Sequence, residues 1–321
     1  MQENCWEENS YLIDEGLKVL KGIIDFHLHP FLKYVSESRL LSELKEAGIE
    51  YAVLIALDVD AKDLDRPEIL ERTLQRFLDL HIWTSPQVID GMRNLLEIAR
   101  IDNKQVTDLM MKYPHKFLGF GSVNLSHDKS YIDEKIKEID RLGLRGIKLI
   151  PTLQFFNPAK SKKRMKKIFS FCERKRKIVM FHSGCDPHVW EIPQFSEDAN
   201  PKNIEYMIKG FKKVPVILAH MGSYSARYPG LWLDEAMRLG ENYDNVWFDI
   251  SAVTYLVTKK RFVERIRKKV GFDRVLFGSD YPALGEVSIK SIVTEIRDSP
   301  FLTNKEKFQI LIKNARDLLD L

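Results

Sequence analysis

Two histidines stand two positions apart at the end of an apolar run, in the segment IIDFHLHP (23–30). The apolar residues of this segment are typical of a buried strand. Because side chains alternate between the two faces of a strand, His27 and His29 share one face. Two neighbouring imidazoles supply half of the ligands of a typical zinc site. The segment therefore indicates a metal site, and a strand that merely ends in polar residues is the alternative.

Other ionisable side chains stand at the ends of apolar runs further along the chain. His182 ends the run KIVMFH, His220 ends VPVILAH, and Asp280 ends RVLFGSD. A lone histidine in such a place is more often structural, but four of the chain's eight histidines share this placement, together with a carboxylate. Histidine nitrogens and carboxylate oxygens suit divalent ions of hard to borderline character.

The elements that must bring these residues together form a repeating pattern of apolar runs and amphipathic stretches. Eight such βα units in sequence predict an α/β fold, a parallel sheet closed into a (β/α)8 TIM barrel. An open doubly wound sheet is less favoured, because no GxGxxG turn follows the first strand. In a barrel the carboxyl ends of all strands meet on one face, so the four histidines, Asp280 and Lys148 are expected to converge there. The expected strands are 22–28, 51–57, 117–125, 145–150, 177–182, 214–220, 245–251 and 274–280.

One stretch departs from the repeat. Residues 58–116 contain extra helical patterns, at 67–83 and 85–101, between the second and third strands. Loops at this end of a barrel strand lie over the barrel mouth. We therefore expect residues 1–321 to form a single barrel domain with a helical insertion at 58–116 that acts as a lid. A contact between two copies of the chain in a homodimer is a further role open to this insertion.

Composition and charge exclude several classes of protein. The 50 basic and 46 acidic residues nearly balance, giving a net charge of +4, so a nucleic-acid partner is not expected. No membrane partner is expected either, because no uncharged apolar stretch approaches the ~18 residues of a transmembrane helix. The basic runs at 160–169 and 173–177 are interpreted as the solvated face of an outer helix, with an anionic partner as the alternative. Three cysteines without close spacing suit a reducing compartment. The acidic first ten residues lack the features of a signal peptide, and a cytoplasmic location is expected.

Several motifs, taken together, carry a family resemblance. The segments DFHLHP (25–30), RGIKL (145–149), FHSG (181–184), LAHMG (218–222), FDIS (248–251) and FGSDYP (277–282) resemble the amidohydrolase superfamily, and are most similar to its amidohydrolase-related branch. That branch includes aminocarboxymuconate semialdehyde decarboxylase and several lactone and ring hydrolases. TatD-type nucleases resemble the chain less, because the position of Lys148 is acidic in them.

The resemblance implies a metal-dependent enzyme. It implies that His27, His29, His182 and Asp280 hold one metal ion, usually zinc. His220 matches a histidine that orients or deprotonates the attacking water, a task that Asp280 can share. Zn²⁺ would lower the pKa of that water and polarise a substrate carbonyl.

Three roles stay open for Lys148. In binuclear relatives a lysine on the fourth strand is carboxylated and bridges two metal ions. Alternatively, Lys148 remains cationic and binds a carboxylate of the substrate, or it is a structural lysine paired with a neighbouring acid. Two further candidates for substrate binding are Gln154, in PTLQFFNP, and Arg227, in GSYSARYPG.

The leading prediction is a hydrolase that attacks a C–O or C–N acyl bond of a small, carboxylate-bearing molecule. The alternative is a metal-dependent non-oxidative decarboxylase of an aromatic or unsaturated acid. A third class, a non-catalytic binding protein on a barrel scaffold, is disfavoured because every position of the implied metal site is filled.

Overall fold

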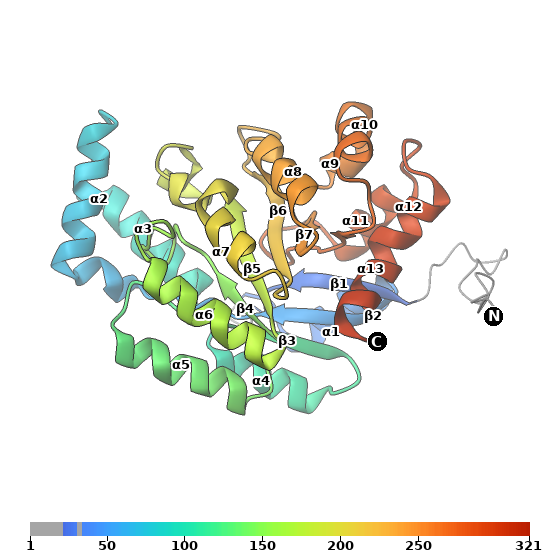
Figure 1. Ribbon diagram of the computed structural model, residues 1–321, viewed down its shortest axis with the longest axis horizontal. Coiled ribbons are helices and arrows are strands. Elements are labelled where there is room, and N and C mark those ends of the chain that lie inside the picture. Colours follow the sequence, from blue (N-terminus) through green and yellow to red (C-terminus); the bar gives the residue numbers. More distant parts are fainter. Residues whose placement is uncertain (1–21, 31–33) are drawn as a thin grey trace.

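The computed structural model describes residues 22–30 and 34–321, so the acidic N-terminal segment and Cys5 lie outside the described residues. Eight parallel strands follow one another around a single sheet in the order β1 to β8 (Figure 1). The strands are β1 Ile23–Leu28, β2 Ile49–Ile55, β3 Phe117–Ser122, β4 Gly146–Leu149, β5 Ile178–Gly184, β6 Val216–Tyr224, β7 Val246–Asp249 and β8 Val275–Leu276.

Helices alternate with these strands and surround them. The α-helices are α1 Glu37–Glu46, α2 Pro67–Asp79, α3 Pro86–Ala99, α4 Asn103–Lys112, α5 Lys129–Arg141, α6 Lys162–Lys175, α7 Glu205–Gly210, α8 Leu233–Asn242, α9 Tyr255–Thr258, α10 Lys260–Lys269, α11 Ile289–Arg297, α12 Asn304–Phe308 and α13 Asn314–Leu319. Short 3₁₀ segments are η1 Ala61–Asp65, η2 His188–Glu191, η3 Glu197–Ala199 and η4 Pro201–Ile204, and the π-helical turn η5 spans Gln309–Lys313.

The sheet closes between its first and last strands. The backbone N–H of Phe26 donates to the carbonyl of Phe277 at 2.9 Å, and that of His29 donates to the carbonyl of Tyr281 at 2.9 Å. The predicted (β/α)8 TIM barrel is thereby confirmed. β8 is much shorter than the expected run 274–280, because the residues after Leu276 bond to β1 in an irregular register rather than continuing the ladder.

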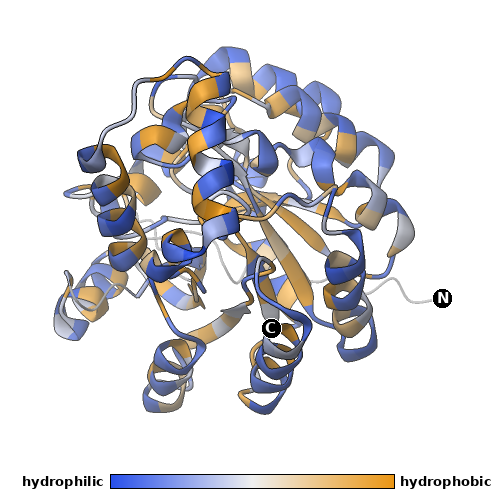
Figure 2. Cartoon of the chain, turned by 90° about the vertical axis from the view of Figure 1, so that its left-hand side faces the viewer, coloured by the Kyte–Doolittle hydropathy of each residue, from blue (hydrophilic) through white to orange (hydrophobic). Residues whose placement is uncertain are grey.

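The core lies between the strands and the ring of helices. The strands are buried almost throughout, and Figure 2 shows hydrophobic strands inside helices whose colour changes from one face to the other. Helix α6 illustrates the pattern: its buried residues include Met165, Ile168 and Phe169, whereas Lys162 and Lys166 are exposed. A stripe at this spacing buries one side of a helix against the sheet. Among the described helices, none has the length and apolar character needed to cross a bilayer.

The extra helices after β2 form a closed excursion from the barrel. Leu57 and Ile101 bond to each other through both backbone N–H groups, at 2.9 and 3.0 Å, so the two ends of the excursion lie together. Between them lie η1, α2 and α3, and α2 projects beyond the ring of barrel helices (Figure 1). Helix α4 packs on β3 in the manner of an ordinary barrel helix. The expected lid role of residues 58–116 stays a prediction.

Candidate metal and substrate site

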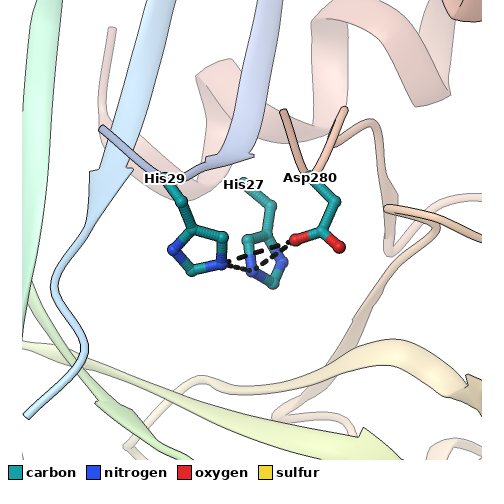
Figure 3. A group of neighbouring side chains, drawn as sticks. All are labelled: His27, His29 and Asp280. Atoms are coloured by element: carbon teal, nitrogen blue, oxygen red, sulfur yellow. Dashed lines mark hydrogen bonds and ion pairs between the residues drawn. The ribbon is translucent and has the colours of Figure 1, made fainter. Parts of the chain in front are cut away.

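The two histidines at the end of β1 meet the aspartate that follows β8. His27 Nε2 lies 3.2 Å from His29 Nε2, and Asp280 Oδ1 lies 3.7 Å from the first and 3.4 Å from the second (Figure 3). The backbone N–H of Asp280 donates to the His27 carbonyl at 2.8 Å, which places its side chain beside the histidines. Although burial opposes the effect, hydrogen bonding to His29 and the charges of the neighbouring histidines lower the pKa of Asp280 to about 2. Asp280 is therefore an ionised carboxylate.

Asp249, at the end of β7, binds the Nδ1 side of the His27 ring, opposite the Nε2 that faces His29. Its Oδ2 lies 3.0 Å from His27 Nδ1, and its Oδ1 accepts from the backbone N–H groups of His220 and Ser251, both at 3.0 Å. Although burial opposes the effect, interactions with His27, His220 and Lys148 lower the pKa of Asp249 well below its usual value. Because an ionised carboxylate only accepts, the proton of His27 lies on Nδ1 and the lone pair on Nε2. A carboxylate that fixes a histidine in this way is typical of metal sites.

His182 and His220 end the neighbouring strands β5 and β6. Their rings lie 4.8 Å apart between centroids, and the His220 ring lies 5.0 Å from that of His27. His220 Nδ1 lies 2.8 Å from the carbonyl of Ser251, which leaves its Nε2 as an acceptor. His182 Nε2 is buried and makes no hydrogen bond with the described residues. Its nearest charged neighbour is Asp186 Oδ2, at 3.4 Å. A buried imidazole nitrogen without a hydrogen bond is costly unless a ligand occupies it.

Burial keeps these imidazoles neutral. Burial and the nearby Lys148 lower the pKa of His27 to about 3, and burial lowers the pKa of His182 and His220 as well. Neutral imidazole is the form that binds metal ions. The donor set of histidine nitrogens and an ionised carboxylate therefore fits a divalent ion, and the absence of a hydrogen bond at His182 Nε2 agrees with that fit.

Lys148 lies in the middle of the site. Its Nζ is 3.2 Å from His27 Nε2, and the side chain is fully buried on β4. Burial lowers the pKa of Lys148 to about 8, and Asp249, Asp280 and Asp186 oppose the decrease. At neutral pH Lys148 is thus mainly protonated beside the proposed metal ligands, and three carboxylates support its charge.

A cavity of about 160 Å³ opens above these groups. Its polar lining comprises His29, Lys148, His182, Asp186, His220, Tyr224 and Asp280. Its remaining lining is largely apolar, and three of these residues, Leu95, Ile98 and Ala99, belong to α3. The excursion after β2 therefore contributes part of the cavity wall.

The structure does not bring two of the sequence candidates to this cavity. Gln154 is buried, but its amide is used within the loop: Oε1 accepts from the N–H of Ile150 at 2.9 Å and Nε2 donates to Ser122 Oγ at 3.0 Å. Arg227 is exposed on the loop after β6, and its backbone N–H donates to Glu191 Oε1 at 3.0 Å. Neither belongs to the described residues that line the cavity.

Two cavity residues escaped the sequence analysis. Asp186 accepts a hydrogen bond from Thr152 Oγ1, and its Oδ2 lies 3.4 Å from His182 Nε2. Burial, opposed by Thr152 and Lys148, raises its pKa to about 7. Tyr224 ends β6, and its ring centroid lies 4.3 Å from that of His220. Asp186 stands four residues after His182 and Tyr224 four residues after His220, beyond the ends of the expected strands. This spacing from the two histidines was the feature of the sequence that could have indicated them.

Comparisons with solved structures agree with the fold. An uncharacterized TIM-barrel protein from Bordetella bronchiseptica is 19% identical, with a TM-score of 0.66 over 93% of this chain and 98% of that one. A probable 2-pyrone-4,6-dicarboxylic acid hydrolase from Acinetobacter baumannii, with citric acid bound, is 14% identical, with a TM-score of 0.60 over 94% and 100%. A 5-carboxyvanillate decarboxylase from Novosphingobium aromaticivorans, complexed with manganese and a nitrobenzoic acid, is 16% identical, with a TM-score of 0.58 over 94% and 96%.

The sequence itself matches at the level of a family. No curated protein matches the chain. The family model described as amidohydrolase matches residues 24–321, which include the barrel from the second residue of β1 onward and every residue of the site described above. The chain therefore belongs to the amidohydrolase family of enzymes.

Proposed function

We propose that the chain is a metal-dependent hydrolase acting on a C–O or C–N acyl bond of a small, carboxylate-bearing molecule. The observation that carries the proposal is the convergence of His27, His29 and Asp280 beside Lys148 under one small cavity. A nitrogen and carboxylate cluster next to a buried cation suits the joint binding of a metal ion and an anionic substrate.

We propose that the ion is zinc and that its ligands are His27, His29, His182 and Asp280. Three histidines with one carboxylate form a donor set that zinc accepts. When bound, such an ion acts as a Lewis acid toward a carbonyl oxygen and lowers the pKa of water toward neutrality. The 5-carboxyvanillate decarboxylase has a similar fold and carries manganese, so the fold alone does not determine which ion is bound, and zinc is our proposal.

The remaining groups receive roles from their hydrogen bonds. His220 can take a proton at Nε2, because its Nδ1 is engaged by the carbonyl of Ser251. Asp280 is ionised and can share that proton. The buried ammonium group of Lys148 can pair with a substrate carboxylate at the base of the cavity. The α3 residues above it would exclude water from the bound substrate.

Non-oxidative decarboxylation of an aromatic or unsaturated acid is the second candidate. The apolar wall of the cavity favours it, because a planar ring would pack against Leu95, Ile98 and Leu153. The similarity to a decarboxylase of a carboxylated aromatic compound supports the same candidate. In this reaction Lys148 would hold the acid and His220 would deliver a proton to carbon in place of activating water.

The two candidates differ in their products. We would load the purified protein with zinc or manganese and assay lactones, cyclic amides and aromatic acids for ring opening and for release of carbon dioxide. His220→Gln provides the matched variant, because it keeps a polar side chain but removes the titrating imidazole. Ring opening that is lost in His220→Gln supports the hydrolase, and release of carbon dioxide supports the second candidate. Full metal loading with no turnover of any compound would instead indicate a binding protein.

A further inference from the structure

A second cleft in the described part of the chain lies at the opposite end of the barrel from the cavity. Its volume is about 890 Å³, and its wall includes residues that directly precede β4, β5 and β6. From Lys177, at the start of β5, to His182 the strand rises by about 16 Å. The cleft is therefore separate from the proposed metal and substrate site.

Basic residues from three successive loops line this cleft. Arg145 comes from the loop before β4, Arg176 and Lys177 from the loop before β5, and Lys213 from the loop before β6. Lys175, at the end of α6, adds a fifth positive charge. Cations near the end of α6 are accounted for by the helix dipole, but Arg145 and Lys213 belong to other elements. Their gathering around one cleft needs a different explanation.

The charges of the cleft are only partly balanced by the protein. Lys175 pairs with Asp140 at 2.8 Å, and Lys177 donates to the carbonyl of Leu144 at 2.7 Å. Among the described residues, neither Arg176 nor Lys213 has an ion-pair partner, and both are exposed. The acidic residues that line the cleft are Glu173 and Asp320, against five basic ones. The surplus of positive charge favours an anion.

The shape and the apolar part of the lining narrow the class of ligand. The volume lies in the range of small-molecule sites, of roughly 300 to 1,000 Å³, and is far larger than one inorganic phosphate needs. The cleft is also lined by apolar residues: Pro215 and Leu318 are half-buried and offer an apolar surface, whereas Leu144, Ile178 and Leu319 are buried. A ligand that has several negative charges and an apolar or aromatic portion matches both features.

We propose that this cleft binds an organic polyphosphate, such as a nucleoside triphosphate, at the amino-terminal end of the barrel. The phosphates would lie against Arg176, Lys213 and Arg145, and the organic portion against Pro215 and Leu318. Guanidinium and ammonium groups are the usual protein partners of phosphate oxygens. This site is additional to the proposed metal and substrate site and does not depend on the reaction assigned there.

Calorimetric titration tests the proposal with ATP, ADP, adenosine and inorganic tripolyphosphate as probes at low salt. We expect ATP to bind in a saturable manner, ADP to bind more weakly and adenosine not to bind. Arg176→Ala and Lys213→Ala should each weaken ATP binding about tenfold, the usual scale for a lost hydrogen bond to a charged group. Added salt should weaken binding further. Lys268→Ala is the matched control, because Lys268 is an exposed lysine on α10, away from the cleft.

Three outcomes would overturn the proposal. The first is no saturable ATP binding at millimolar concentration. The second is ATP binding that is unchanged in Arg176→Ala and Lys213→Ala. Both side chains are exposed, so both variants should keep the melting temperature of the wild type, and a change in binding cannot come from unfolding. The third is an oligonucleotide that displaces ATP and binds more tightly as its length increases, which would assign the surface to nucleic acid.

Discussion

Replacing Asp249 by asparagine tests how the site prepares His27. Asparagine has nearly the same size, and its carbonyl oxygen can still accept from the backbone N–H groups of His220 and Ser251. Its NH₂ group would face His27 Nδ1, which now lies 3.0 Å from a carboxylate oxygen. A donor at that place requires His27 Nδ1 to accept, so the proton moves to Nε2, the atom proposed to bind metal.

The size of the effect follows from what is lost and what is kept. Two backbone hydrogen bonds are retained and one charged hydrogen bond is replaced, so the free energy of unfolding should fall by about 1 to 3 kcal/mol. The affinity for metal should fall about 10- to 100-fold, as it does when other carboxylates behind metal-binding histidines are removed. Activity should recover in part at high metal concentration.

Competition with a fluorescent zinc chelator measures the affinity, and denaturant unfolding measures the stability. Asp249→Ala is the comparison, because it also removes the acceptors of the two backbone N–H groups and should unfold at clearly lower denaturant. A folded Asp249→Asn protein with the metal affinity of the wild type would refute the reasoning that Asp249 fixes the tautomer of His27.

Three further predictions concern packing, the lid and the cysteines. Gly184→Ala should lower the free energy of unfolding by about 3 kcal/mol, because a Cβ there would lie 2.4 Å from the Cβ of Tyr224 on β6. Gly143→Ala is the control: a Cβ there meets nothing within 4 Å, so denaturant titration should show a loss of only about 1 kcal/mol. Ala99→Phe should fill part of the cavity under α3 and lower kcat/KM at least tenfold at unchanged metal content; equal activity would show that α3 does not border bound substrate. Native Cys172 and Cys185 should resist iodoacetamide, because burial raises the pKa of both thiols to about 12; mass spectrometry showing rapid alkylation of either residue at pH 8 would contradict this.

The residues that could be predicted from the sequence are those that the sheet itself places. A strand buried on both faces has a continuous apolar sequence, and its last residues lie at the carboxyl end of the barrel regardless of the conformation of the loops. This is why His27, His29 and Lys148 were expected in one place and are found there. The strand ends were less predictable: β6 continues to Tyr224, because it pairs with β5 beyond His220.

Loop residues depend on contacts that the sequence does not reveal. Arg227 is four residues beyond the strand residue Ser223, but the Glu191 carboxylate holds its backbone N–H on an exposed turn. Gln154 stands in a loop beside the cavity, yet its amide serves the loop backbone. Asp186 reaches the cavity through a hydrogen bond with Thr152, from the loop after another strand. Such pairings become visible only once the loops are placed.

The same limit applies to the protonation of Lys148. The sequence places it on β4, whereas its pKa of about 8 depends on complete burial and on three carboxylates from other elements. An amine with this pKa is partly neutral near pH 8, which is the form that carboxylation requires. The carbamate bridge and the substrate-binding cation are therefore both consistent with its surroundings, and metal stoichiometry separates them.

Elemental analysis of protein purified without added metal tests the central claim most directly, in the wild type and in His27→Ala, Asp280→Ala and Lys148→Ala. We predict about one zinc ion per chain in the wild type, a loss in the first two variants and retention in Lys148→Ala. About two ions per chain, falling in all three variants, would instead indicate a carboxylated Lys148 bridge. A wild-type protein that holds no divalent ion, even after incubation with zinc or manganese, would contradict the account of the His27 and His29 pair.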